Sequence, residues 1–119
     1  MGSGRFLKSK KSSIKVRAVE PLGSVIFGGT RGKFLIQGGG LSHVPKLLDK
    51  ALIDTSYHVS DADAIKAIYR FADETGLLVG GTAGLVLHDL YKLAETAKPD
   101  EVIIAVSYTH LTLPTILLV

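Results

Sequence analysis

Thr82 is the residue of this sequence best placed to present a polar group to a small ligand. It follows three apolar residues at 77–79, which predict a short buried strand, and the glycines Gly80 and Gly81. An apolar pattern of helical period runs over residues 85–94, so a helix should begin at Thr82. Glycines let backbone approach a ligand closely, and the first turn of a helix offers unpaired N–H groups. The stretch could present the hydroxyl to a ligand, but the residues alone favour the simpler interpretation of Thr82 as a helix N-cap.

A second stretch suited to binding is a glycine-rich loop over residues 24–41. Its glycines are Gly28, Gly29, Gly32, Gly38, Gly39 and Gly40. Glycine at this density disfavours regular helix or strand, and a long loop inside a small domain is usually functional or mobile. The run 38–40 lacks the spacing of a dinucleotide-binding turn, and we expect it to open no helix. The composition of the loop predicts a glycine-framed site for a small molecule.

Other common catalytic and metal-binding patterns are missing from the sequence. The histidines are His43, His58, His88 and His110, and no two of them have the spacing of a metal-binding pair. His88 is expected on the exposed side of its helix. There is no G-x-S-x-G nucleophile elbow and no phosphate-binding G-K-[ST] motif. We therefore predict no metal site.

The elements that position these residues alternate between strand and helix. Residues 5–8 are typical of the second half of an amphipathic helix, and residues 14–19 alternate apolar and basic side chains as a half-buried strand does. A short helix is predicted at 44–48, a second strand at 53–59 and a third at 101–105. Strands that alternate with helices in this way favour an α/β fold with a largely parallel sheet.

The clearest helix is predicted between Ser60 and Gly76. Ser60 and Asp63 have the spacing of a capping box, and Gly76 suits the left-handed residue that ends a helix. Apolar residues at helical period should form the buried stripe of this helix. The residues of that stripe are Ile65, Ile68, Tyr69 and Ala72.

The composition is typical of a single soluble globular domain. The 119 residues are 46% hydrophobic and 21% charged, and there is no cysteine to form a disulfide or bind a metal. The lack of cysteine fits a reducing compartment, so we expect a cytoplasmic protein. No apolar run approaches the roughly 20 residues of a membrane span, and no apolar segment of a signal peptide follows the basic N-terminus. We therefore expect no membrane partner.

Positive charge is concentrated near the N-terminus, although the whole chain carries a net charge of only +3. The cations that precede the first acidic residue are Arg5, Lys8, Lys10, Lys11, Lys15 and Arg17. A basic arm for nucleic acid is one interpretation. Phe6 is the only aromatic residue among these cations, and no recognition motif accompanies them. We therefore expect a solvated surface and no nucleic-acid partner.

Several segments, in their order and spacing, resemble the C-terminal half of the fold-type II pyridoxal-phosphate enzymes, the cysteine synthase and cystathionine β-synthase family. They are residues 4–8, 14–21, 36–40, 52–54, 59–61 and 76–84. The resemblance implies a fragment of a three-layer, mostly parallel-sheet α/β domain of the kind found in the tryptophan synthase β subunit. Residues 20–29 are most similar to the siderophore branch, whose members make precursors of 2,3-diaminopropionate.

The resemblance implies a role for each glycine-rich stretch. At the position of Thr82, beside Gly81, relatives carry a hydroxyl that faces the pyridine nitrogen of pyridoxal 5'-phosphate. A neutral hydroxyl does not hold the ring protonated as a carboxylate would, which suits β-elimination and β-replacement on O-activated serine. The segment that resembles the loop close to cofactor and substrate contains Gln37, Gly38, Gly39 and Gly40. Many relatives have a bulkier apolar residue at the position of Gly39.

The resemblance also implies what this chain leaves out. In the family, the lysine that binds the cofactor covalently and the asparagine-containing substrate loop lie in the N-terminal half, and no lysine here aligns with that one. We expect residues 1–105 to be part of an enzyme domain without its catalytic lysine, inactive alone, whose parent is a homodimer acting on an amino-acid substrate. Residues 106–119 resemble translated library-adapter sequence and are expected to be a non-native tail. The alternative is a small free-standing α/β ligand-binding module with a glycine-rich loop.

Overall fold

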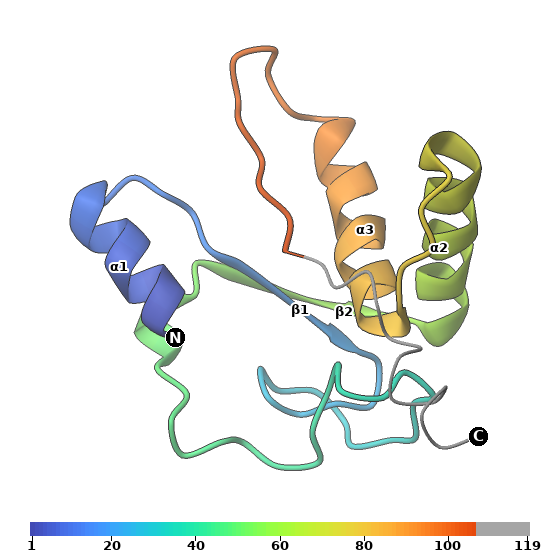
Figure 1. Ribbon diagram of the computed structural model, residues 1–119. Helices are drawn as coiled ribbons and strands as arrows, with labels where there is room; N and C mark the ends of the chain where they lie inside the picture. Colours follow the sequence, from blue (N-terminus) through green and yellow to red (C-terminus); the bar gives the residue numbers. More distant parts are fainter. Residues whose placement is uncertain (107–119) are drawn as a thin grey trace, which may run out of the picture.

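The computed structural model describes residues 1–106 of the 119-residue chain. Its elements are α1 (Gly2–Lys10), β1 (Arg17–Pro21), the 3₁₀ helix η1 (Lys50–Leu52), β2 (Thr55–Val59), α2 (Asp61–Thr75) and α3 (Gly81–Ala94), as shown in Figure 1. Apart from the exposed Val106, the predicted tail at 106–119 lies outside the described residues. Within residues 1–106, no helix is long and apolar enough to cross a membrane.

Strands β1 and β2 pair in parallel, which confirms the parallel sheet predicted from the sequence. The register places Glu20 of β1 directly opposite His58 of β2. Both strands begin two or three residues later than predicted. Just before the two strands, the Asp54 carboxylate accepts a hydrogen bond from the N–H of Val16 at 2.7 Å, in place of a bond between strands. Pairing of the strands therefore starts only after these residues.

The helix predicted between Ser60 and Gly76 is confirmed at both ends. Ser60 is the N-cap of α2, and its Oγ accepts a hydrogen bond from the N–H of Asp63 at 3.1 Å. The same hydroxyl contacts the Asp63 carboxylate at 2.7 Å, and this hydrogen bond lowers the pKa of the carboxyl. Gly76 ends the helix in the left-handed conformation, with φ of 74°.

The buried face of α2 differs from the predicted stripe. Ile65 and Tyr69 are exposed, whereas Ala64 and Ala67 are buried among residues of α3. The cause is a close crossing of the two helices, since a Cβ added at Gly84 of α3 would lie 2.5 Å from the carbonyl oxygen of Ala64. Only small residues allow two helices to approach so closely. The alanines therefore face α3, and two of the larger apolar residues face outward.

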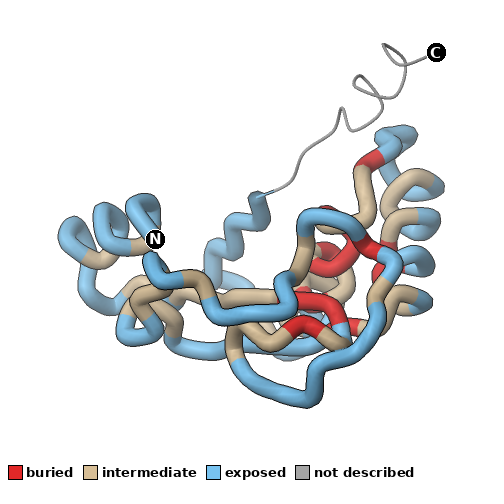
Figure 2. The backbone as a smooth tube through the Cα atoms, turned by 90° about the horizontal axis from the view of Figure 1, so that it is seen from below, coloured by how far each residue is buried: buried red, intermediate tan, exposed pale blue. Residues whose placement is uncertain are grey.

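The buried core lies around α3, as the red segments of the tube in Figure 2 indicate. α3 packs against α2 and against both strands of the sheet. One cluster of buried side chains consists of Ile36, Val59, Ala64 and Leu85. The other consists of Ala67, Val79, Ala83 and Leu87. Because α3 contributes to both clusters, it is the central element of the fold.

The two short strands predicted at 77–79 and 101–105 are not formed. Leu77 and Leu78 are exposed, and only the third residue of that segment is buried. A strand needs a neighbouring strand to receive its backbone hydrogen bonds. Over residues 1–106 the sheet contains only β1 and β2, so these apolar segments have no strand beside them to pair with.

The short helix predicted at 44–48 is also not formed. Its residues make a turn closed by a hydrogen bond from the N–H of Leu48 to the carbonyl of Pro45 at 3.1 Å. Helical backbone begins later, at η1, where the side chain of Asp49 accepts a hydrogen bond from the N–H of Ala51 at 3.2 Å. A five-residue helix closes too few backbone hydrogen bonds to offset the entropy of ordering it.

Candidate functional site

Residues 37–41, which we call the glycine loop, lie where the carboxyl ends of both strands meet the start of α3 (Figure 1). Ile36, just before the loop, is buried with Val59 at the end of β2 and with Leu85 of α3. Pro21, the last residue of β1, lies against the same loop. In sheets of parallel strands, ligands commonly bind at this carboxyl edge. The predicted binding loop is therefore at the edge of the sheet where binding is expected.

Thr82 and the glycine loop, two separate stretches in the sequence, meet in the structure. Oγ1 of Thr82 donates a hydrogen bond to the carbonyl oxygen of Gln37 at 3.2 Å. Within the described chain, α3 begins at Gly81 with Gly80 as its N-cap residue and no capping side chain. Thr82 is thus the second residue of the helix, and the interpretation of Thr82 as an N-cap is wrong. Glycine is one of the residues commonly found at an N-cap, and Gly80 has the extended backbone of that position.

The middle of the glycine loop is packed so closely that side chains would not fit. A Cβ at Gly39 would lie 2.7 Å from Cδ1 of Leu85, which occupies the space that a bulkier residue would need. A Cβ at Gly40 would lie 2.6 Å from Cβ of Ser24. The loop therefore presents its own backbone at the edge of the sheet.

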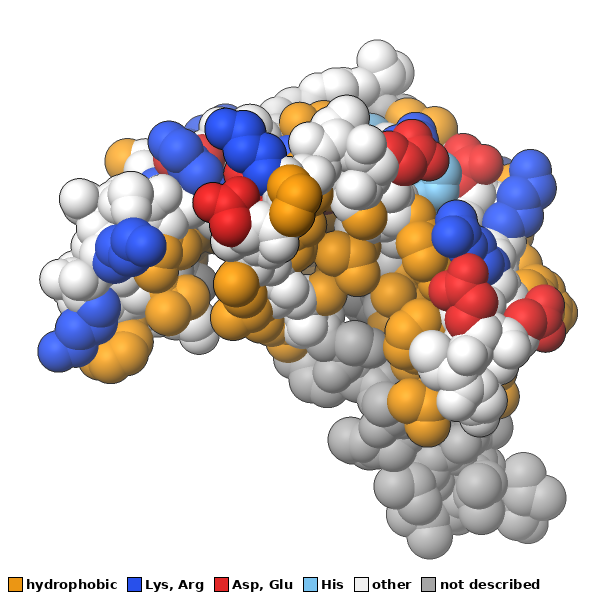
Figure 3. Space-filling view, turned by 90° about the horizontal axis from the view of Figure 1, so that it is seen from above, with side chains coloured by type: hydrophobic (Ala, Val, Ile, Leu, Met, Phe, Trp, Pro, Cys, Tyr) orange, Lys and Arg blue, Asp and Glu red, His pale blue; other side chains and the backbone are white. Residues whose placement is uncertain are grey.

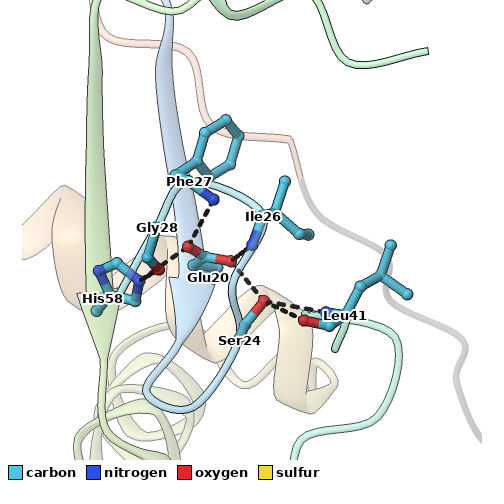
Figure 4. Close-up of polar contacts among 7 residues, drawn as sticks. All are labelled: Glu20, Ser24, Ile26, Phe27, Gly28, Leu41 and His58. Carbon is cyan, nitrogen blue, oxygen red and sulfur yellow. Dashed lines mark hydrogen bonds and ion pairs between the residues drawn. The ribbon is translucent and has the colours of Figure 1, made fainter. Parts of the chain in front are cut away.

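Beside the loop lies a buried carboxylate that the sequence patterns did not reveal. Glu20, at the end of β1, is 1% exposed, and its two oxygens meet a set of donors drawn in Figure 4. The donors are Ser24 Oγ, Ile26 N at 3.1 Å, Phe27 N at 3.0 Å and His58 Nε2 at 2.8 Å. A lone acidic residue between Val19 and Pro21 is the sequence signal that could have marked it. Its partners follow only from strand register and from the path of the next loop.

Ser24 connects this carboxylate to the glycine loop. Ser24 is fully buried, and its hydroxyl donates to Glu20 and accepts a hydrogen bond from the N–H of Leu41 at 3.0 Å. Leu41 is the last residue of the glycine loop, whereas the first, Gln37, is held by Thr82. The loop is therefore fixed at both of its ends.

An ion pair fixes α3, and with it Thr82, to the sheet. Nε and Nη2 of Arg17 on β1 donate to the two carboxylate oxygens of Asp89 on α3 at 3.0 and 2.8 Å. The guanidinium also lies 4.3 Å from the centre of the Tyr57 ring. Hydrogen bonding to Asp89 raises the pKa of Arg17, so the guanidinium stays charged. Because Asp89 is buried, this ion pair sets the position of α3 on the sheet.

The histidines of the described residues form no metal-binding cluster. Among residues 1–106, no group of histidine, aspartate and glutamate side chains is arranged to hold a metal ion. His58 lies in the Glu20 network, His43 is exposed, and His88 is half-buried on α3. His110 lies outside the described residues.

Several cations of the basic N-terminal segment are paired with acidic residues. Arg5 contacts Asp49 at 3.4 Å, and Asp54 is contacted by Lys8 at 2.7 Å and by Lys15 at 3.7 Å. Figure 3 shows basic and acidic side chains next to one another on the face it displays. Cations already paired with carboxylates have less charge to offer a phosphate backbone. These contacts favour the solvated-surface interpretation.

The edge formed by Thr82 and the glycine loop is open. Thr82 is half-buried, and a shallow hollow among the described residues lies at the other end of β2, lined by Phe27, Lys50 and residues 53–56. That hollow contains none of the residues predicted to bind a ligand. The carboxyl edge presents loop backbone and the Thr82 hydroxyl.

Parallel strands, a glycine loop at their carboxyl edge and an uncharged hydroxyl in the first turn of the next helix are typical of α/β proteins that bind small molecules at this edge. Residues 1–108 match the family described as pyridoxal-phosphate dependent enzymes. Because this match covers most of the chain, the chain belongs to that family. The resemblance seen in the sequence is thereby confirmed.

Curated relatives include enzymes that act on amino acids. The chain is 32% identical over 105 residues to the O-acetylserine dependent cystathionine beta-synthase of Bacillus subtilis, covering 88% of this chain and 34% of that protein. It is 34% identical over 104 residues to the N-(2-amino-2-carboxyethyl)-L-glutamate synthase of Ralstonia nicotianae, covering 87% of this chain and 31% of that protein. The chain thus spans about a third of the length of the curated relatives it matches.

Solved structures give the same picture of the fold. A mutant of O-ureido-L-serine synthase with O-ureido-L-serine bound superposes with a TM-score of 0.83 at 27% identity, over 98% of this chain and 37% of that one. The O-acetylserine dependent cystathionine beta-synthase of Helicobacter pylori superposes with a TM-score of 0.70 at 32% identity, over 82% of this chain and 32% of that one. The predicted fold class, part of a parallel-sheet α/β domain of this family, is confirmed.

Proposed function

We propose that this chain forms the ring-facing and substrate-facing side of a pyridoxal-phosphate dependent enzyme that performs β-elimination and β-replacement on an O-activated serine. One observation carries the proposal, the Thr82 hydroxyl at 3.2 Å from the Gln37 carbonyl at the carboxyl edge of the sheet. Thr82 and Gly81 would face the cofactor, and residues 37–40 would pass close to cofactor and substrate. Relatives named for O-acetylserine and O-ureido-L-serine support this reaction class.

Glycines flank the Thr82 hydroxyl at this edge. Gly38 has a positive φ of 78°, and a Cβ there would lie 3.9 Å from Oγ1 of Thr82. A Cβ at Gly81 would lie 3.1 Å from Cγ2 of Ile36. Glycine thus avoids backbone strain at position 38 and a close contact with Ile36 at position 81, and it leaves the hydroxyl side of both positions without a side chain.

Thr82 would contact the ring nitrogen through its uncharged hydroxyl. Pyridoxal phosphate, when bound, supplies an electron sink for the bonds at the substrate's α-carbon. The single hydroxyl proton of Thr82 is donated to Gln37 here, and it can rotate about the Cβ–Oγ1 bond toward another acceptor. A threonine does not hold the ring protonated as a carboxylate would, which suits elimination of a good leaving group from serine.

The proposal assigns the covalent lysine to a part of the family's domain outside this chain, which would therefore be inactive alone. The exposed apolar side chains support this, since neighbouring elements of a larger domain would cover them. They include Leu77, Leu78, Val102 and Ile104. The parent would be a cytoplasmic homodimer that takes an amino-acid substrate, with residues 106–119 as a non-native tail. Membership of the siderophore branch stays a prediction.

A chimera tests the role of Thr82. It joins residues 1–106 to the N-terminal two thirds, roughly, of the Bacillus subtilis relative, which this chain matches over 34% of its length. Turnover of O-acetylserine and cofactor absorbance are measured for the parent chimera and its variants. We expect Thr82→Ser to keep activity, Thr82→Ala to weaken cofactor binding and turnover, and Thr82→Asp to alter the absorbance because a carboxylate stabilises the protonated ring. A Thr82→Asp chimera equal to the parent in both readouts would overturn the role of Thr82.

A second test uses this chain alone. The chain is mixed with pyridoxal phosphate and reduced with borohydride, and its lysine-containing peptides are examined by mass spectrometry. We expect no single lysine to be labelled stoichiometrically, because the family's covalent lysine has no counterpart in the sequence. One fully labelled lysine together with turnover of O-acetylserine would contradict the assignment.

A further inference from the structure

The carboxylate of Glu20 organises the turn that follows β1. Its contacts all come from donors, with Ser24 Oγ and Ile26 N at Oε2, and Phe27 N and His58 Nε2 at Oε1 (Figure 4). Oε2 therefore accepts two hydrogen bonds, and Oε1 accepts one and also lies 2.8 Å from the imidazole nitrogen of His58. Backbone and side-chain donors within a few residues converge on one point, so the turn is wrapped around the carboxylate.

His58 closes the network from the neighbouring strand, where it lies directly opposite Glu20. Its Nε2 faces two acceptors, Oε1 of Glu20 at 2.8 Å and the carbonyl of Gly28 at 3.1 Å. Both contacts are with acceptor oxygens, so they fit the tautomer that carries its hydrogen on Nε2. A Cβ at Gly29 would come within 3.3 Å of the same nitrogen. The second strand thus also holds the turn in place.

The network reaches the glycine loop through two hydrogen bonds at Leu41. The N–H of Leu41 donates to Ser24 Oγ, and its carbonyl accepts from the N–H of Val25, both at 3.0 Å. We infer that Glu20, acting through Ser24, is a positioning residue that sets the place of the glycine loop at the substrate. That the loop lies at the substrate rests on the proposed function, whereas the contacts that hold the loop are observed in the structure.

The variant Ser24→Ala isolates the link between carboxylate and loop. It removes the hydroxyl that contacts Leu41 but leaves Glu20 its contacts with Ile26, Phe27 and His58. Amide hydrogen exchange of this chain, followed by NMR, should become about tenfold faster at Leu41, the effect of losing one hydrogen bond. Exchange within α2 and α3 should stay as in the parent. An unchanged rate at Leu41 would overturn the inference.

The variant Glu20→Gln tests the carboxylate itself. A side-chain amide places an NH₂ group against donors whichever way it turns, so exchange should become faster at Ile26, Phe27 and Leu41 together. Glu101→Gln is the matched control, because Glu101 accepts a hydrogen bond from the N–H of Lys98 at 2.9 Å in an exposed turn. The control should leave exchange at Leu41 unchanged. If Glu20→Gln does not fold, Ser24→Ala decides the question.

The chimera separates positioning from simple anchoring. There, Ser24→Ala should raise KM for O-acetylserine severalfold, with less effect on kcat and none on cofactor absorbance, since Thr82 is untouched. Faster exchange at Leu41 with an unchanged KM would overturn the positioning role. A parent chimera without activity would count against the proposed function, and the exchange rates of this chain would still decide whether Glu20 and Ser24 hold the loop.

Discussion

The two ends of the small sheet are held in different ways. At the carboxyl end, α3 and the glycine loop meet both strands through a cluster of buried apolar side chains and the buried Glu20 network. At the amino end, α1 is attached by contacts such as those of Lys8 with Asp54 and Arg5 with Asp49, and none of the residues of α1 is buried. Buried contacts, both apolar and polar, hold the carboxyl end, whereas exposed and half-buried ion pairs attach α1 at the amino end.

This difference explains where a binding site can be built. Closely packed interiors resist small displacements, whereas exposed ion pairs contribute little and are screened by salt. Thr82 and the glycine loop lie at the packed end. The ion pair of Arg17, the first residue of β1, with Asp89 ties α3 to the sheet farther from that end. The predictions below perturb each end in turn, from the largest expected effect to the smallest.

The largest loss of stability is expected for Arg17→Ala. Arg17 pairs with the buried Asp89 and lies over a tyrosine ring, so the variant leaves a buried carboxylate without its partner. We expect the free energy of unfolding, measured with urea, to fall by about 3 kcal/mol. Arg70→Ala is the matched control, since Arg70 also pairs with a carboxylate and stacks on a tyrosine but is 58% exposed. The loss for Arg70→Ala should be much smaller, because its ion pair is exposed, and equal losses would show that burial does not matter here.

A smaller loss is expected for Gly84→Ala at the crossing of α2 and α3. The new Cβ would lie 2.5 Å from the carbonyl oxygen of Ala64 and 2.7 Å from Cγ1 of Ile68. We expect a loss of about 1–3 kcal/mol in the free energy of unfolding from overpacking. Gly2→Ala on α1 is the control, because a Cβ there meets no atom within 4 Å. That control should be neutral or stabilising by up to about 1 kcal/mol through helix propensity; equal losses at both positions would contradict the close crossing.

Features that depend on near neighbours along the chain could be predicted from the sequence. The ends of α2 follow from Ser60, Asp63 and Gly76, each of which acts on backbone within one turn. The strand predicted at 77–79 is not formed, because a strand needs a second strand to pair with and local apolar residues do not supply one. The predicted buried face of α2 was wrong because the actual face depends on the close approach of Gly84, a residue of another helix.

The members of the candidate site could be predicted better than its geometry. Thr82 and residues 37–40 were identified from glycine patterns and from the family resemblance, and their contact with one another is a finding of the structure. Their roles toward cofactor and substrate stay predictions. The pairing of Glu20 with His58 could not be foreseen, because it requires the register of two strands that are distant in the sequence.

The smallest effect is expected at the amino end, for Asp54→Asn. Asp54 accepts hydrogen bonds from Lys8 Nζ and from the N–H of Val16, both at 2.7 Å, and these two bonds lower the pKa of its carboxyl. A carboxyl whose pKa is lower in the folded state contributes stability above its unfolded pKa, and that stability is lost as the pH falls through the folded pKa. Melting temperatures from circular dichroism should therefore fall more steeply in the parent than in Asp54→Asn between about pH 5 and about pH 2.

The matched control for this comparison is Asp73→Asn on α2. Asp73 is exposed, and its carboxylate makes no hydrogen bond or ion pair within residues 1–106. It should follow the melting curve of the parent, while Asp54→Asn is less stable above about pH 5 and approaches the parent at lower pH. If Asp54→Asn also follows the parent, charge does not hold α1. The helix would then be attached by apolar contact, for which Val16 is the nearest candidate, because its methyl groups lie 3.8 and 3.9 Å from a Cβ built on Gly4.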